Sequence, residues 1–211
     1  MAIFRNLLWG ALILLVACGQ ENSPEDITPM SPPLTEEVLP LQGNWKSKCI
    51  DPREVGLGEV VRLQINGSSF RRHFLISPHG DCSSPYIEGR IEGRLVFRPE
   101  RISEEGRAVD VEARVATLKP LTELAAKVMN LAETCGYTDW KVNVEKEVYD
   151  RMGEPGCNER YPKTDYTIIA TEKNEAGRDL LLFGAGERLT NPSRRPVRLD
   201  RSEQVFVLDG P

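Results

Sequence analysis

Apolar and polar residues alternate with a period of two along most of the chain after residue 57, which is typical of β-strands with one buried face. The clearest example is the stretch 109–115, where apolar residues alternate with charged ones. The same pattern predicts strands at 58–66, 68–77, 86–97, 166–170, 180–183 and 205–208. This succession of short strands indicates a chain built mainly from β-structure.

Two features predict how these strands connect and bend. Asn66-Gly67 lies between the first two strands, and this dipeptide is the strongest short signal for a β-hairpin turn. Gly89 and Gly93 interrupt the strand 86–97, where glycine marks a bulge or a bend of a closed sheet. The sequence therefore predicts a hairpin over 58–77, followed by a curved strand.

One segment departs from the alternation and predicts a helix over about residues 120–135. Its apolar residues are three and four positions apart, which is the spacing of one face of an α-helix. Pro120 suits the first helical turn, and Gly136 suits the position after the last turn. We expect the apolar face to pack across the sheet; it consists of Leu121, Leu124, Val128, Leu131 and Cys135.

A further strand begins at Gly43, and 142–148 also fits a solvated strand, which makes about eight or nine strands with one helix inserted midway. This succession indicates a mainly β fold, arranged as an antiparallel barrel or a sandwich. Residues 43–211 make up about 170 residues, which is the size of one domain. A domain of this length buries a substantial core. We therefore expect a single β-rich domain preceded by a separate N-terminal region.

The N-terminal region has the order of parts found in a secretory signal peptide: Arg5, then an apolar run from Leu7 to Val16 that ends in small residues. The run is too short for a transmembrane helix, which needs about 20 residues. Ala17-Cys18-Gly19 then resembles the lipobox of bacterial lipoprotein precursors. This resemblance implies that residues 1–17 are removed and that Cys18 becomes the acylated first residue.

Each buried CH₂ of a palmitate-like chain contributes about 0.8 kcal/mol, and a single acyl chain holds a protein at a membrane only marginally. Lipoproteins of this family carry three acyl chains, so the resemblance implies permanent attachment through Cys18. In this family an Asp after the cysteine signals inner-membrane retention. Gly19 therefore implies the outer membrane, with the protein facing the periplasm or the cell surface. Residues 18–42 contain five prolines and no apolar periodicity, which favours a flexible, extended tether. The predicted order is signal peptide 1–17, lipid-bearing tether 18–42 and β-domain 43–211.

Four of the five cysteines remain after Cys18 is assigned to the lipid. An even number in an exported domain indicates two disulfides, and four cysteines allow three pairings. We favour the pairing of neighbours along the chain, Cys49–Cys82 and Cys135–Cys157. A zinc site needs ligands at short spacings, which these cysteines lack, so we expect no metal.

Charge and motifs argue against several classes of function. The net charge of −5 at pH 7 becomes −6 when Arg5 is removed, which provides no electrostatic reason to bind nucleic acid. The Gly-x-Gly segments at 56–58 and 184–186 lack the third glycine and the following helix of a dinucleotide site. No Gly-x-Ser-x-Gly or His-Glu-x-x-His motif occurs. We therefore expect neither an enzyme nor a bound cofactor.

Gly43-Asn44-Trp45 at the start of the domain resembles the Gly-x-Trp motif of lipocalins, whose tryptophan closes the barrel floor. With it, the segments 41–49, 81–82, 135–140 and 182–184 resemble a group of lipocalin-like bacterial lipoproteins that have no assigned activity. The resemblance implies an antiparallel lipocalin-like β-barrel with Gly43 and Trp45 at its floor. It also implies an opposite end that is open to a small apolar ligand.

Three functions follow from these observations. The first is an envelope binding or interaction module for a small apolar ligand or another envelope component. The second is a structural lipoprotein whose barrel is filled by side chains. The third is a hydrolase using Glu145, Glu147 and Asp150, a segment that also fits a solvated strand. A basic segment near the C-terminus is either a solvated loop or a contact for an anionic envelope partner; it contains Arg194, Arg195, Arg198 and Arg201.

Lipid on Cys18 predicts that growth of the native host with a fatty-acid analogue labels the wild-type protein. The Cys18→Ala variant should lose the label, because the acylated thiol is gone. Gel fluorescence of the purified protein measures this. Cys49→Ala is the matched control, since that cysteine is expected in a disulfide and its removal should leave the label in place. Equal labelling of wild type and Cys18→Ala would show that the lipid is elsewhere.

Overall fold

The computed structural model describes residues 41–50, 56–99, 104–154, 156–157, 162–185, 190–202 and 205–209. The expected signal peptide, the lipid-bearing Cys18 and the tether up to residue 40 lie outside the described residues. Within those ranges, no helix is both long enough and apolar enough to cross a membrane.

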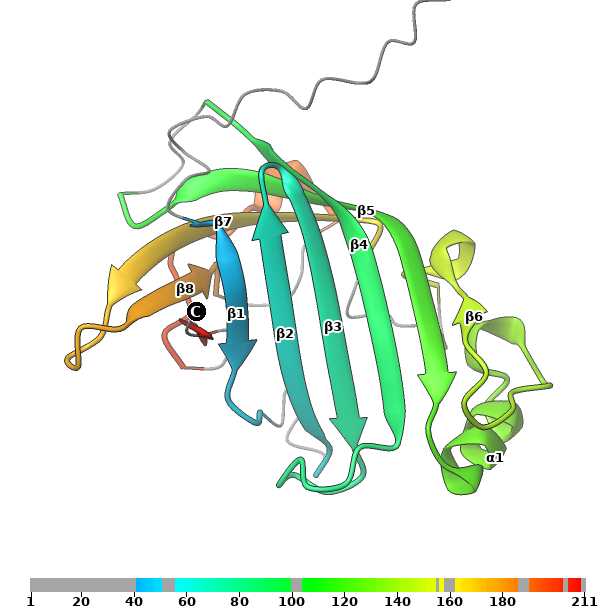
Figure 1. Cartoon of the computed structure of the whole chain (residues 1–211). Coiled ribbons are helices and arrows are strands. Elements are labelled where there is room, and N and C mark those ends of the chain that lie inside the picture. Colours follow the sequence, from blue (N-terminus) through cyan, green and yellow to red (C-terminus); the bar gives the residue numbers. More distant parts are fainter. Residues whose placement is uncertain are drawn as a thin grey trace, which may run out of the picture. The chain divides into compact units, whose positions relative to one another are not determined.

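The described residues form nine antiparallel strands, eight of which close into a β-barrel (Figure 1). The sheet order is β4-β3-β2-β1-β9-β8-β7-β5-β6, and an additional pairing of β4 with β5 closes the ring, leaving β6 as an extra strand. The mainly β, lipocalin-like barrel expected from the sequence is confirmed. The strands are β1 (Gly43–Ser47), β2 (Gly58–Asn66), β3 (Ser69–Ser77), β4 (Ile87–Phe97), β5 (Arg107–Pro120), β6 (Lys146–Glu147), β7 (Thr164–Lys173), β8 (Asp179–Phe183) and β9 (Val205–Leu208).

β5 closes the barrel because it pairs along both of its edges. On one edge it pairs with β4, from Pro120 opposite Ile87 to Val109 opposite Phe97. On the other edge, the first half of β5 pairs with β7 and a short part near its end pairs with β6. The strand is therefore shared between the front of the barrel and its far wall (Figure 1).

Two glycines in β4 allow the sheet to bend sharply enough to close. A side chain at Gly89 would begin 2.0 Å from the ring of Phe74, and one at Gly93 would begin 1.9 Å from the carbonyl oxygen of Glu112. The pairing register shifts between Glu92 and Gly93, which is a bulge. The bend predicted from these glycines is confirmed, because any larger residue would collide with neighbouring groups.

The predicted hairpin is also confirmed. β2 and β3 pair over their full lengths, from Gly58 opposite Ser77 to Asn66 opposite Ser69. Gly67 in the turn has φ +60°, a left-handed conformation that glycine adopts at no steric cost. The Asn66-Gly67 signal therefore placed the turn correctly.

Trp45 is anchored at the end of the barrel where β1 begins. Its side chain is 2 % exposed, and its indole N–H donates a hydrogen bond to the Leu41 carbonyl oxygen at 2.9 Å. Gly43 has φ +135°, and a side chain there would begin 2.7 Å from Leu208. Leu41 itself is buried, and the Gln42 amide forms hydrogen bonds with the backbone of the β2–β3 turn. These two residues, which the sequence placed at the end of the tether, therefore belong to the barrel.

The helix expected over about 120–135 is present but shorter, since α1 spans Glu123–Leu131. Pro120 is the last residue of β5, and Thr122 caps the helix by accepting a hydrogen bond from the Ala125 N–H at 3.1 Å. Gly136 does not cap α1 but ends the separate 3₁₀ turn η2. The 3₁₀ turns are η2 (Thr134–Gly136), η3 (Tyr149–Arg151) and η4 (Pro192–Arg194).

The buried face of α1 is not the one expected from the sequence. Leu124, Val128 and Leu131 are 62 %, 44 % and 76 % exposed. The side-chain amide of Asn130 forms hydrogen bonds with both backbone groups of Trp140, at 2.6 and 3.0 Å, and thereby sets the rotation of the helix. That rotation turns another set of apolar side chains toward the protein, and the buried residues are Ala125, Ala126 and Met129.

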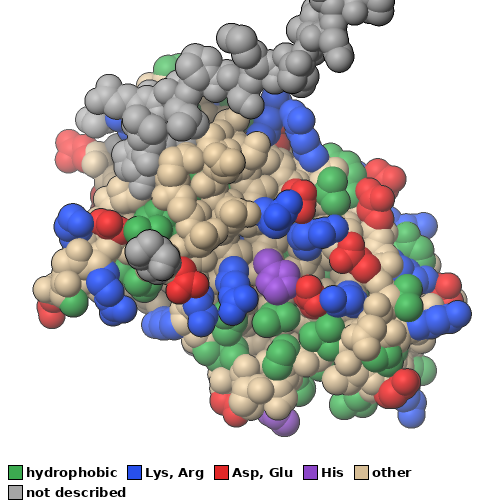
Figure 2. Space-filling view, in the orientation of Figure 1, with side chains coloured by type: hydrophobic (Ala, Val, Ile, Leu, Met, Phe, Trp, Pro, Cys, Tyr) green, Lys and Arg blue, Asp and Glu red, His purple; other side chains and the backbone are tan. Residues whose placement is uncertain are grey.

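The outer face of β1–β4 is rich in charged side chains, as alternation with a buried inner face predicts (Figure 2). Arg71 pairs with Glu92 at 2.8 Å, and Arg94 pairs with Glu112 at 2.6 Å, each across neighbouring strands. Exposed pairs of this kind contribute only about 0–1 kcal/mol each. The stability of the barrel therefore comes mainly from its interior.

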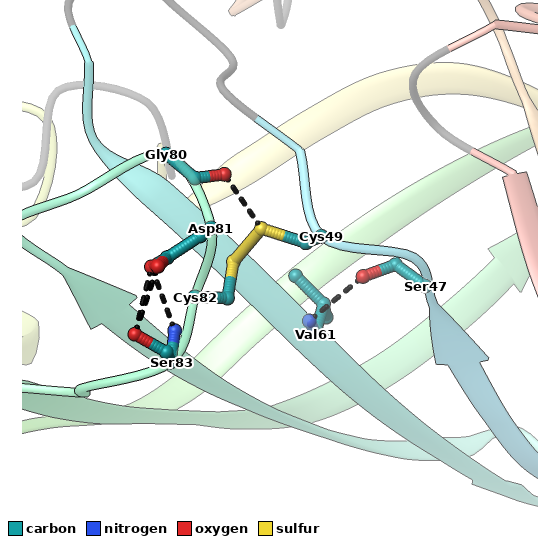
Figure 3. The surroundings of a disulfide bond; sticks show 7 residues. All are labelled: Ser47, Cys49, Val61, Gly80, Asp81, Cys82 and Ser83. Carbon is teal, nitrogen blue, oxygen red and sulfur yellow. Dashed lines mark hydrogen bonds between the residues drawn. A yellow bond between two sulfur atoms is a disulfide. The ribbon is translucent and has the colours of Figure 1, made fainter.

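Both disulfides join neighbours along the chain, as the sequence indicated. Cys49–Cys82 links the segment after β1 to the segment between β3 and β4, at the barrel end opposite the β2–β3 turn (Figure 3). Cys135–Cys157 links η2 to the segment that precedes β7. On the loop-entropy argument each contributes about 3–4 kcal/mol, so they stabilise segments that the sheet alone does not hold.

Burial of Trp45 predicts a large loss of stability for Trp45→Ala, by about 3–5 kcal/mol. For a domain of this size, that loss lowers the melting temperature by roughly 6–20 °C. Thermal unfolding of the oxidised protein lacking residues 1–40 measures the change. Val197→Ala is the control, because Val197 is 56 % exposed and should melt close to wild type. A Trp45→Ala variant that melts with the control would show that Trp45 is not a core anchor.

Candidate functional site

Side chains from the barrel strands fill the lumen, which is the space that the eight strands enclose. Trp45, Phe74 and Leu181 are among the large residues there, and each is at most 2 % exposed. Together with the other inward-facing apolar residues they form one continuous core cluster. The lumen is therefore a packed interior, as small eight-stranded barrels allow.

A cavity of about 30 Å³ lies in this lumen, beside Phe70, Leu95 and Phe183. Pockets for small-molecule ligands measure about 300–1,000 Å³. A space of 30 Å³ holds one or two water molecules instead. In the described residues, the lumen thus offers no room for an acyl chain or a comparable apolar ligand.

Charged side chains at the same cavity also favour water over an apolar molecule. Arg72 and Asp165 form part of its wall. Arg72 lies 3.8 Å from Glu59, and the two side chains are 12 % and 3 % exposed. Charged groups inside a protein are stable only when they remain paired or solvated. An apolar occupant would remove water from this wall and would therefore be disfavoured.

The three carboxylates considered for hydrolysis lie in solvent. Glu145, Glu147 and Asp150 are all exposed, and Glu145 forms an ion pair with Arg90 at 3.1 Å. A catalytic acid needs burial or a like-charged neighbour to raise its pKa, and exposure to water works against this. In the part of the chain that the structure describes, no group of three or more His, Cys, Asp or Glu side chains is placed to hold a metal ion.

Trp140 anchors the segment after α1. It is 3 % exposed and meets the ring of Tyr137 edge-on, with 5.5 Å between ring centroids. Lys146 lies 4.6 Å from the centre of the Tyr137 ring and donates a hydrogen bond to Asp139. This bond lowers the pKa of the exposed Asp139 carboxyl. The cluster joins the extra strand β6 to the segment after the helix.

The basic segment near the C-terminus does not present its arginines as one surface. Arg195 is turned inward and pairs with Asp110 at 2.6 Å, and their side chains are 5 % and 2 % exposed. Its guanidinium also donates hydrogen bonds to the carbonyl oxygens of Val109 and Thr167, at 2.6 and 2.9 Å. Arg98 pairs with the other carboxylate oxygen of Asp110. This buried cluster fastens the segment after β8 to β5 and β7.

Arg201 is also held in ion pairs, with Glu105 at 3.1 Å and with Glu172 at 2.7 Å. The Leu199 N–H and the Arg201 guanidinium lower the pKa of Glu105. Arg194 and Arg198 are exposed. Two of the four arginines therefore stabilise the fold, and the segment is not a solvated loop throughout.

The two most exposed large apolar side chains among the described residues, Leu131 and Leu124, lie on α1. We call Leu124, Val128 and Leu131 the α1 outer face. Beside it, a groove of about 450 Å³ separates α1 from the segment 140–142; its walls include Ala126, Leu131, Trp140 and Val142, with Lys127 and Lys141 among the polar groups. This volume lies in the range of ligand pockets.

Sequence reasoning missed this surface because it assigned these residues to the core. A signal for the alternative was present, since Ala125, Ala126 and Met129 form a second apolar stripe with helical spacing. No protein-family model matches the chain. The candidate functional site therefore rests on geometry, which favours the outer surface over the lumen.

The filled lumen predicts that a fluorescent fatty acid shows no saturable binding to the wild-type protein. The reason is the 30 Å³ cavity, which is far smaller than the probe. Fluorescence titration of the protein lacking residues 1–40 measures it, and Leu131→Glu distinguishes the two places where a probe could bind. Saturable binding that survives Leu131→Glu would show that the lumen opens. Binding that is lost in this variant would place the probe in the groove beside α1.

Proposed function

We propose that this protein is a lipid-anchored interaction module of the bacterial cell envelope, in which a filled barrel supports an outer surface that contacts a protein partner. The observation that carries the proposal is the contrast between a lumen with a 30 Å³ cavity and a helix that turns two leucines and a valine to solvent. A carrier of apolar ligands needs the reverse arrangement, with a wide lumen and a polar exterior.

Energetics supports a partner at the α1 outer face. Full burial of a Leu or Val side chain contributes about 1.5–3 kcal/mol relative to exposure. The Asn130–Trp140 hydrogen bonds hold the helix in a rotation that leaves Leu124, Val128 and Leu131 exposed, so these side chains do not contribute that burial energy. A partner with a complementary apolar surface would recover it. Three apolar positions on one helix face are the usual anchors of a protein contact of this kind.

The N-terminal region supports the anchoring part of the proposal. The order of Arg5, the apolar run and Ala17-Cys18 is that of a lipoprotein precursor, and Gly19 favours the outer membrane. An exported location agrees with two disulfides in the domain. The tether would leave the barrel facing the periplasm or the cell surface at a distance from the lipid.

A second candidate is a structural lipoprotein without a specific partner, favoured by the packed lumen and the two disulfides. The two candidates differ in whether a partner occupies the α1 outer face. An interaction module keeps a partner at the α1 outer face, whereas a purely structural protein leaves that face in water.

The test is site-specific photo-crosslinking in the native host, with a photoreactive amino acid at Leu131. We expect one discrete crosslinked product that is lost when Leu124→Glu is added, because a carboxylate prevents apolar contact. The matched control carries the same photoreactive residue at Glu175, which is exposed in the β7–β8 turn. Similar products from both positions, or none from Leu131, would contradict the interaction module and favour the structural alternative. Cys18 remains intact throughout, so a failure of anchoring is scored separately by membrane fractionation.

A further inference from the structure

Three basic side chains lie in one row on the outer face of the barrel. The strand register places Lys46 of β1 opposite Arg62 of β2, and Arg62 opposite His73 of β3. Directly opposed residues point to the same side of a sheet. Their chain neighbours Trp45, Val61 and Phe74 are buried in the lumen, so the row faces outward.

This register is electrostatically unfavourable in the absence of a partner. Like charges directly opposite each other destabilise a strand pair, because their Cβ atoms are only about 4.5–5.5 Å apart. The nearest outward positions around Arg62 on these three strands carry no carboxylate; they are Asn44, Lys46, Val60, Gln64, Arg71, His73 and Leu75. Among the described residues, Arg62 therefore forms no ion pair with an acid, unlike Arg71 and Arg94 on the same face.

The acidic groups nearest the row have partners other than Lys46 and Arg62. Glu88 accepts a hydrogen bond from His73 Nε2 at 2.9 Å and also pairs with Lys119. Glu92 pairs with Arg71 at 2.8 Å. Glu88 thus orients the His73 ring, and the positive charge of Lys46 and Arg62 remains uncompensated by these two carboxylates.

The same three residues line a pocket of about 120 Å³. We call it the β1–β3 pocket; its walls are Lys46, Val60, Arg62, His73, Leu75 and Cys82. The aliphatic side chains and the Cys49–Cys82 disulfide form a low-dielectric wall, which strengthens the field of the cations. The pocket has room for several waters or for one polyatomic anion. Figure 2 shows Lys and Arg side chains around a histidine on this face of the barrel.

We propose that the β1–β3 pocket binds a phosphate group, with Arg62 as the bidentate donor, Lys46 as a second charge and His73 as part of the wall. A guanidinium matches two phosphate oxygens at once, and an ammonium adds a point charge. The phosphate belongs to a free ion or to a phosphomonoester headgroup of an envelope lipid. The site is separate from the α1 outer face, so its test does not depend on the proposed function.

The first arm of the test is the melting temperature of the mature chain, residues 18–211, carrying Cys18→Ser so that no acyl chain is attached. Inorganic phosphate should raise the melting temperature of this protein relative to chloride at equal ionic strength, since a ligand of the folded state stabilises it. Arg62→Gln should abolish most of the rise and weaken phosphate binding by roughly tenfold, the value of one charge-assisted hydrogen bond. In chloride alone the variant should melt no lower than the parent protein, because the substitution removes a like-charge contact.

Arg71→Gln is the matched control, since it removes the same charge from the same face but outside the β1–β3 pocket, where Arg71 pairs with Glu92. It should retain the phosphate-dependent rise. The proposal would be overturned if phosphate does not raise the melting temperature of the parent protein. An equal loss of the rise in both variants would also overturn it, because that result indicates diffuse attraction of phosphate to a basic face.

The second arm separates the two sources of phosphate. The parent protein is floated with phosphatidylcholine vesicles and with vesicles that also contain phosphatidic acid. Flotation that requires phosphatidic acid and is lost in Arg62→Gln assigns the site to a lipid headgroup. A phosphate-dependent rise in melting temperature without flotation assigns it to the free ion.

Discussion

The pairing of β4 with β5 is the constraint on which the rest of the structure depends. Without it the sheet would be an open ribbon with two exposed edges, which template aggregation. Closure is possible because Gly89 and Gly93 leave room for the Phe74 ring and for the β5 backbone. Once the ring is closed, every strand has an inner and an outer face. The size of the ring then decides that ordinary side chains fill the lumen, and the described residues there line a cavity of about 30 Å³.

Closure also explains why the connecting segments are fastened by other means. β5 extends past the ring to β6, and α1 follows at the same end of the barrel (Figure 1). Segments there lie outside the ring of strands, so Cys135–Cys157 and the Asn130–Trp140 hydrogen bonds hold them in addition to their apolar packing against the core. On the far wall, Asp110 holds the segment after β8 in place by pairing with Arg98 and Arg195. A buried ion pair of this kind is costly to break, which fixes the position of the segment after β8.

Two surfaces therefore carry the functional proposals, and both lie outside the lumen. The α1 outer face is apolar and suits a protein contact, whereas the β1–β3 pocket is basic and suits an anion. They have different physical origins. The first exists because Asn130 sets the helix rotation, and the second exists because the strand register aligns Lys46, Arg62 and His73.

The sequence by itself determined the features that depend on local patterns. Period-two alternation predicted the strands, Asn66-Gly67 predicted the hairpin, and Gly43-x-Trp45 indicated a buried tryptophan at the start of the barrel. Cysteine order indicated the two disulfides. The tertiary structure alone decided how α1 is rotated, because two apolar stripes compete along that helix and only the contact with Trp140 chooses between them. It also decided the width of the lumen, the inward turn of Arg195 and the alignment of Lys46, Arg62 and His73. Each of these depends on which residues meet across strands that are far apart in the chain, and a one-dimensional pattern does not contain that register.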